Sequence, residues 1–149
     1  MTGRAASSRR QLGPQDYRLL AEFRRLLRLF LVFSEERAAE VGLAPQQHQA
    51  LLAIKGHEGG VPTVGDLAER LAIRHHSAVG LVNRLARAGY VVRRGDRSDK
   101  RRVTLKLTKD GEAVLRKLTA LHRAELRRVA PLLKPLLAQL QDSRAMALE

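Results

Sequence analysis

The residues best suited to chemistry form two neighbouring groups, at 74–87 and 93–102. In the first group, polar side chains recur at helical spacing and no carboxylate is among them. The second group is a run of arginines and lysines around Asp96 and Asp99. Guanidinium, imidazole, hydroxyl and amide groups donate hydrogen bonds to phosphate oxygens and to base edges. The chemistry indicated is recognition of a dense anion, with no catalytic residue expected.

The positive charge of the chain is concentrated in the same stretch. The 149 residues carry 28 Lys+Arg and 15 Asp+Glu, a formal charge of +13. Residues 70–109 account for a net +10 of that charge, because only Asp96 and Asp99 oppose the basic residues there. A local excess of this kind favours double-stranded DNA as the partner. An anionic membrane surface is the competing interpretation, but the expected hairpin splits the basic segment, unlike an amphipathic membrane helix.

The composition excludes several classes of protein. Hydrophobic residues make up 44% of the chain, so a packed domain is expected, and the lack of cysteine excludes disulfides and thiol chemistry. The five histidines make no recognisable metal-ligand set, and metal sensing remains a minor alternative. No phosphate-binding glycine loop or nucleophile motif appears, so we expect no cofactor, no metal and no enzyme. Nothing resembles a membrane span or a secretory signal, and we expect a cytoplasmic protein.

Apolar periodicity predicts the elements that position the two groups. Helices are expected at about 16–41, 46–55, 64–71, 76–87 and 108–126, with a last helical segment punctuated by Pro131 and Pro135. Alternation of apolar and polar residues predicts strands at 90–92 and 103–107, joined by a basic tip at 93–101. Thr63 and Asp66 predict a capping box, and Gly89 predicts a left-handed helix end, whereas Gly111 is expected to weaken the first turn of its helix.

The order helix, tight break, helix, hairpin is that of a helix-turn-helix with a β wing. We expect a mainly α (α+β) fold with a DNA-binding lobe at 45–110 inside a domain at 16–141. The leucine-rich helices at 16–41 and 112–141 are expected to form a dimerisation region, with a flexible tail at 1–15 and a C-terminal tail at 142–149. The alternative is that these terminal helices pack on each other within one chain.

The helix at about 76–87 is expected to enter the major groove, and the wing at 93–102 to lie at the minor groove. Residues early in the helix are expected to meet base edges, whereas Arg84 and Arg87 meet phosphate. Asp96 and Asp99 are expected to pair with neighbouring cations and hold the wing's shape. The predicted DNA-binding residues are Arg74, His75, His76, Ser77, Val79, Gly80, Asn83, Arg84, Arg87, Arg94, Arg97, Ser98, Lys100 and Arg101.

These segments resemble the MarR family of winged-helix bacterial transcriptional regulators. The matching residues are Leu81-Val82-Asn83-Arg84-Leu85, Gly89-Tyr90-Val91, DRSDKR from Asp96 to Arg101, and Leu107-Thr108 with Gly111. The resemblance implies a homodimer on a pseudo-palindromic operator, and a small anionic or aromatic effector that weakens operator binding. The wing position that is usually arginine is Ser98 here, so we favour Arg97 for the minor groove.

The leading hypothesis is therefore a sequence-specific, ligand-responsive DNA-binding regulator, usually a repressor in this family. The alternative is an architectural DNA-binding protein that tolerates any sequence. The two differ in a simple observation, because only the first prefers an operator to random duplex.

Overall fold

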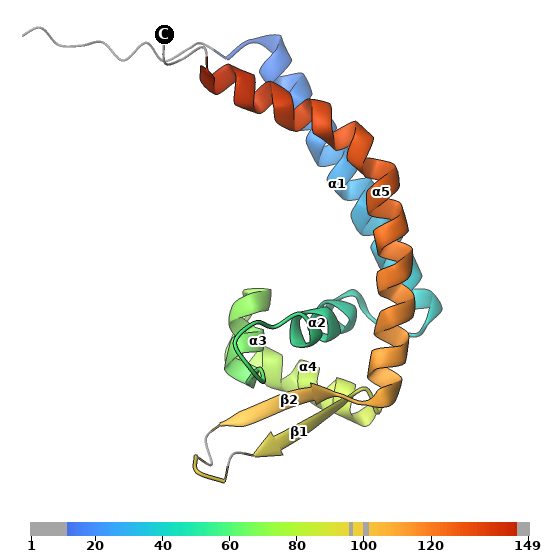
Figure 1. Cartoon of the computed structure of the whole chain (residues 1–149), viewed down its shortest axis with the longest axis vertical. Coiled ribbons are helices and arrows are strands. Elements are labelled where there is room, and N and C mark those ends of the chain that lie inside the picture. Colours follow the sequence, from blue (N-terminus) through green and yellow to red (C-terminus); the bar gives the residue numbers. More distant parts are fainter. Residues whose placement is uncertain (1–11, 96, 100–101, 146–149) are drawn as a thin grey trace, which may run out of the picture. The chain divides into compact units, whose positions relative to one another are not determined.

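The computed structural model describes residues 12–95, 97–99 and 102–145, with side chains to residue 141. The elements in chain order are α1 (Pro14–Glu40), α2 (Pro45–Lys55), α3 (Val64–Leu71), α4 (His75–Arg87), β1 (Val91–Gly95), β2 (Val103–Leu107) and α5 (Lys109–Ala145) (Figure 1). The fold is mainly helical with one two-stranded antiparallel sheet, as expected. The described chain divides into two compact units, one spanning Val32–Glu125 and the other made of the helical ends up to Leu31 and from Leu126.

The unit Val32–Glu125 is built around one apolar core. Its largest fully buried side chains are Leu51, Leu67, Leu81, Val82, Leu85, Leu105 and Leu118, which come from four helices and the hairpin. Burying each such leucine contributes roughly 1.5–3 kcal/mol relative to leaving it exposed. This core fixes α3 and α4 against the hairpin.

The start of α3 is fixed by the predicted capping box. Asp66 N–H donates to Thr63 Oγ1 at 3.1 Å, and Thr63 N–H donates to Asp66 Oδ2 at 2.8 Å. These bonds satisfy donors that a helix N-terminus otherwise leaves open. At the other end of α3, Ala72 takes a left-handed conformation with φ 54°, which turns the chain into α4.

The hairpin is hydrogen-bonded to the loop that precedes α3. Its register runs from Val91 opposite Leu107 to Gly95 opposite Val103. Leu105 N–H donates to the Pro62 carbonyl at 2.8 Å, which fastens the loop before α3 to β2. The first strand is longer than expected, so the prediction that the hairpin tip begins at residue 93 is wrong. The strand extends to Gly95 because residues 93–95 pair with residues 103–105 of β2.

A close approach joins the end of α4 to the start of α5. Gly89 has φ +80°, the predicted left-handed helix end. Thr108 Oγ1 donates to the Gly89 carbonyl at 2.6 Å and accepts from Gly111 N–H at 3.0 Å. A Cβ on Gly111 would lie 2.1 Å from the carbonyl oxygen of Tyr90. Glycine is therefore required at 111 by packing, whereas from the sequence we expected Gly111 to weaken the helix turn and matched it to the family pattern without a packing reason.

The expected interruption of the last helix is wrong. α5 runs without a break from Lys109 to Ala145, with Pro131 and Pro135 inside it. It also passes residue 142, where a C-terminal tail was expected to begin. Each proline removes one backbone hydrogen bond, but the neighbouring residues remain helical on both sides. Of the expected N-terminal tail, residues 1–11 lie outside the described residues and α1 begins at Pro14.

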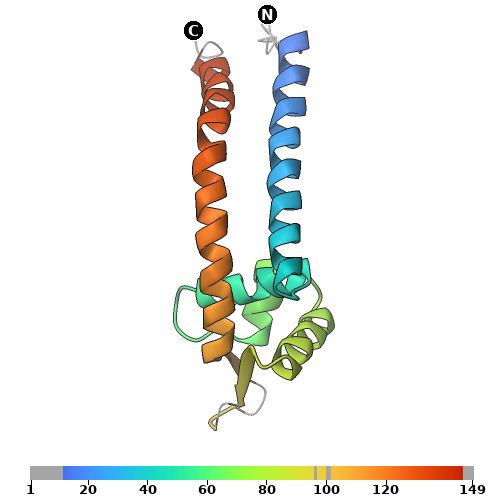
Figure 2. The ribbon, with the colours of Figure 1, turned by 90° about the vertical axis from the view of Figure 1, so that its right-hand side faces the viewer.

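The second unit consists of two helical segments that run side by side, α1 up to Leu31 and α5 from Leu126 (Figure 2). Leu26 and Val129 are buried there. Many other large apolar side chains of this unit are exposed: Tyr17, Leu20, Leu27, Leu29, Leu31, Leu126, Leu132, Leu137 and Leu140. None of the helices in the described part of the chain is both long and apolar enough to cross a membrane.

Candidate nucleic-acid interface

The helix α4 is strongly two-sided. Ala78, Leu81, Val82 and Leu85 are almost completely buried, which confirms the predicted inner stripe. The polar side chains lie on the opposite side: His75, His76, Ser77, Arg84 and Arg87 are exposed, and Asn83 is partly exposed. Val79 and Gly80, on the same side, are also partly exposed. Every long polar side chain on that side can donate a hydrogen bond.

The N-terminus of α4 lacks a side-chain cap. Arg74 is the N-cap residue, it is exposed, and its side chain makes no capping hydrogen bond. The first-turn N–H groups of α4 are consequently not occupied by a capping side chain. Such groups, together with the helix dipole, favour a phosphate or another anion at this end. The exposed Arg74, His75 and His76 surround the same helix end.

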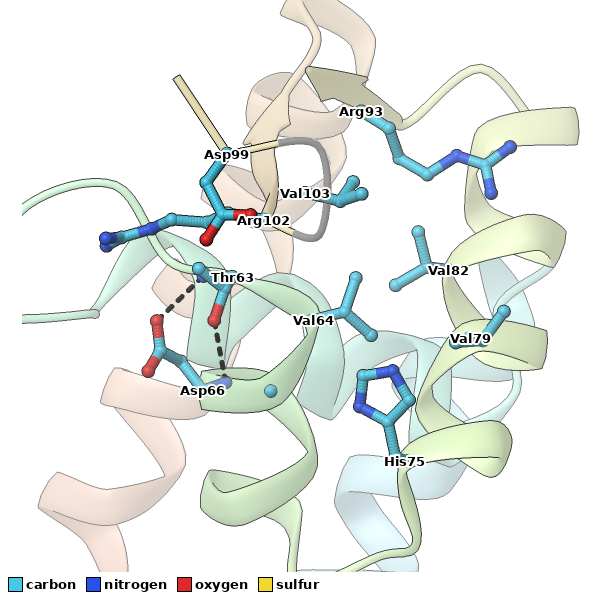
Figure 3. Close-up of a pocket in the computed structure, with 11 residues that line it drawn as sticks. Thr63, Val64, Asp66, His75, Val79, Val82, Arg93, Asp99, Arg102 and Val103 are labelled. Atoms are coloured by element: carbon cyan, nitrogen blue, oxygen red, sulfur yellow. Dashed lines mark hydrogen bonds between the residues drawn. The ribbon is translucent and has the colours of Figure 1, made fainter. Parts of the chain in front are cut away.

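A hollow of about 530 Å³ is lined by residues of α4, the hairpin and the start of α3. Figure 3 shows His75, Val79 and Val82 on its α4 side. Arg93, Asp99, Arg102 and Val103 come from the hairpin, and residues 63–66 come from the start of α3 (Figure 3). The hollow thus lies where α4, the hairpin and the start of α3 meet.

The Asp66 carboxylate at the edge of this hollow is held in its charged form. The hydrogen bonds from the Thr63 backbone and side chain lower the pKa of Asp66, and the charges of His57 and Arg102 lower it further. The carboxylate serves the N-terminus of α3 through the capping box. Asp66 therefore acts as a structural acid within a basic surface.

The loop of the hairpin connects Gly95, at the end of β1, to Val103, at the start of β2. Arg94 lies on β1 and is exposed, as are Arg97 and Ser98 in the turn beyond it. Arg102 N–H donates to the Asp99 carbonyl at 3.0 Å, which closes part of this turn. The predicted site residues Asp96, Lys100 and Arg101 lie outside the described residues. The expected pairing of the two wing aspartates with neighbouring cations stays a prediction.

Two arginines were not among the predicted site residues although they lie in this region. Arg93 donates a hydrogen bond to Asn83 Oδ1 and so links β1 to α4. Arg102 lines the hollow at the start of β2. The sequence signal was their place in the predicted wing at 93–102. Their positions beside α4 and α3 depend on the length and register of the strands.

The histidines have different environments. His75 and His76 are exposed on α4, whereas His48 is buried in the core of the lobe. Among the described residues, no group of three or more histidine or carboxylate side chains is placed to hold a metal ion.

Comparison with known proteins identifies the architecture. Residues 41–102 match the sequence model of the MarR family. The chain is 34% identical over 83 residues to YcgE of Bacillus subtilis, an uncharacterized HTH-type transcriptional regulator, covering 56% of this chain and 53% of that one. It is 37% identical over 91 residues to the HTH-type transcriptional regulator FarR of Neisseria gonorrhoeae, covering 56% and 62%. The chain thus spans less than two thirds of the length of either relative.

Solved structures share the fold. AbsC, a MarR family transcriptional regulator from Streptomyces coelicolor, superimposes with a TM-score of 0.68 at 23% identity, covering 91% of this chain and 99% of that one. The F27L mutant of MepR from S. aureus, bound to an oligodeoxyribonucleotide, gives 0.66 at 19% identity, covering 81% and 94%. At these identities the similarity shows the winged-helix fold with N- and C-terminal helices.

Proposed function

Because residues 41–102 match the sequence model of the MarR family, we propose that the chain is a member of this family and a sequence-specific DNA-binding transcriptional regulator. In this proposal α4 lies in the major groove and the hairpin lies against the neighbouring minor groove. Two copies act together on a pseudo-palindromic operator in the bacterial cytoplasm. Two-fold symmetry of the protein then matches two-fold symmetry of the operator.

One observation carries the proposal: the outward side of α4 is made of donors and lies next to an arginine-bearing hairpin. Residues 70–109, which contain both, hold a net +10. His76 and Ser77, early in α4, are assigned to base edges, and Arg84 and Arg87, late in α4, to phosphates. Arg94, Arg97 and Ser98 are assigned to the wing contact. A surface that only had to be soluble could carry carboxylates and hydrogen-bond donors together, whereas the outward side of α4 carries no carboxylate.

The homodimer is proposed from the helical ends. Leu20, Leu27, Leu29 and Leu31 on α1 and Leu126, Leu132, Leu137 and Leu140 on α5 are exposed, and exposed apolar side chains that gather on one surface mark interaction sites. A second copy, presenting the same leucines, is the partner of matching chemistry. In the dimer, each copy places its basic lobe on one of the two half-sites of the operator.

A response to a small anionic or aromatic effector is proposed from the family alone. No residue of this chain is assigned to that role. The effector would weaken operator binding, so the protein would act as a repressor that leaves its operator when the effector binds.

The experiment is a competition gel shift with the full chain, a duplex from its own upstream region and an excess of random duplex. We expect specific binding to exceed random binding by about 10³-fold or more, and to weaken steeply with salt because many phosphates are contacted. Equal binding to both duplexes would contradict the proposal and support the architectural alternative. Analytical ultracentrifugation of the free protein tests the dimer, and a monomer at micromolar concentration would contradict that part.

A further inference from the structure

Asn83 of α4 is held by the hairpin. The guanidinium of Arg93, on β1, donates a hydrogen bond to Asn83 Oδ1. Figure 3 shows the Arg93 side chain extending from the hairpin toward α4. Arg93 is exposed and Asn83 partly exposed, so the bond lies at the surface where the duplex is proposed to dock.

This bond decides which hydrogen-bonding groups Asn83 can offer. A carboxamide has one oxygen that accepts and one nitrogen that donates two hydrogen bonds. An asparagine that reads adenine uses both at once, accepting from N6 and donating to N7. In the structure Oδ1 already accepts from the Arg93 guanidinium, whereas the two hydrogens on Nδ2 take no part in that bond and can be donated to a base.

The neighbourhood of Asn83 leaves room for a base edge. Gly80 lies three residues earlier, one turn away on the same side of α4. A Cβ at Gly80 would meet only Arg84 Nη1, at 3.7 Å, so protein packing does not demand a glycine there. The absence of a side chain lets a groove floor approach the turn that carries Asn83.

The geometry points to Arg93 as a positioning residue that sets the base preference of Asn83. Held in this way, Asn83 presents its Nδ2 hydrogens and reads guanine, whose O6 and N7 are both acceptors in the major groove. Without Arg93, the amide is free to turn and to read adenine. This inference rests on the proposed function and adds the identity of one base that the site prefers.

The test is selection from a library of randomised duplexes, followed by sequencing of the bound fraction, with the full chain and four variants. The variants are Arg93→Ala, Arg93→Lys, Asn83→Ala and the double variant Arg93→Ala/Asn83→Ala. We expect the parent and Arg93→Lys to select guanine at one position of each half-site, since lysine also donates to Oδ1. We expect Arg93→Ala to change the guanine-to-adenine ratio at that position by at least about fivefold, as expected for one bidentate base contact.

Asn83→Ala should abolish the preference at that position, and Arg93→Ala should change nothing further in the Asn83→Ala background. Thermal unfolding of each variant shows whether the lobe still folds, and a base change in a folded variant is a result that a merely structural role would not produce. An unchanged motif with uniformly weaker binding in Arg93→Ala would overturn the inference, as would a base shift that persists without Asn83. If the parent selects no motif at all, the proposed function fails and this inference fails with it.

Discussion

The imidazole rings of His48 and His122 lie 4.7 Å apart, centroid to centroid, and join α2 to α5 within the unit Val32–Glu125, called the lobe below. His122 also links these helices to α1, because its Nε2 lies 2.7 Å from Ser34 Oγ. The other ring nitrogen of His122 lies 2.7 Å from the Leu118 carbonyl, and Phe33 packs edge-on against the ring. Burial lowers the pKa of His48, and the charge of His122 lowers it further.

This pair predicts that the lobe loses stability in mild acid. In the native state the pKa of His48 is lowered, so His48 takes up its proton at a lower pH than in the unfolded chain, where the ordinary value is 6.5. As the pH falls below that value, the unfolded state takes up more protons and the free energy of unfolding decreases. The loss is about 1.4 kcal/mol for each unit by which the native pKa is lowered.

Urea unfolding at pH 7.5, 6.5 and 5.5 measures this dependence. The variant His48→Gln removes the titrating group while keeping a polar side chain of similar size, and its stability should fall less over the same range. An equal fall in parent and variant would show that His48 is not the group responsible.

Gly111→Ala is expected to destabilise the lobe by about 3 kcal/mol or more, because the new methyl group would collide with the carbonyl of Tyr90. Gly95→Ala is the matched control, since a Cβ there meets nothing within 4 Å. Thermal unfolding of the two variants compares them directly. Similar melting temperatures for both would mean that Tyr90 can move aside.

Thr63→Ala should cost about 1 kcal/mol, the usual loss when an N-cap side chain is removed. The capping bond between Asp66 N–H and Thr63 Oγ1 is lost, and the pKa of Asp66 should rise toward its ordinary value. Thr119→Ala, at an exposed position of α5, is the control and should cost nothing. Denaturant midpoints measure both. A loss of the same size in Thr119→Ala would refute the assigned role of the cap.

Arg84→Ala and Arg97→Ala should each weaken binding to all duplexes and reduce the slope of log K against log salt by about 1 for each phosphate contact removed. Arg116→Ala, at an exposed arginine of α5 outside the proposed interface, is the charge-matched control. Fluorescence anisotropy at four salt concentrations gives the slopes. Parent-like binding by both interface variants would place the interface elsewhere.

His76→Ala and Ser77→Ala should change base preference more than overall affinity, because both residues lie in the first turn of α4. Competition between duplexes that differ at single positions measures this change. A uniform loss across all duplexes would instead assign the two residues to phosphates.

Local patterns predicted much of the lobe. The capping box follows from Thr63 and Asp66 alone, and the inner stripe of α4 follows from its apolar spacing. Both depend on residues a few positions apart, where sequence patterns are most informative.

Features that depend on distant contacts could not be predicted in this way. The need for glycine at 111 arises from the approach of Tyr90, and the Arg93–Asn83 bond arises from the extension of β1. The continuity of α5 through Pro131 was also missed, because the rule that a proline ends a helix considers only the proline and its neighbours in the sequence. The contact between His48 and His122 joins residues on separate helices, and no local spacing indicates it.

Hydrogen–deuterium exchange of the full chain, free and bound to a duplex selected from the library, would locate the DNA-binding surface. We expect slower exchange in peptides covering α4 and the hairpin, with little change in the peptides of α5 that carry Arg116. Unchanged exchange in α4, with protection confined to other elements, would contradict the claim that this helix and the hairpin form the DNA-binding surface.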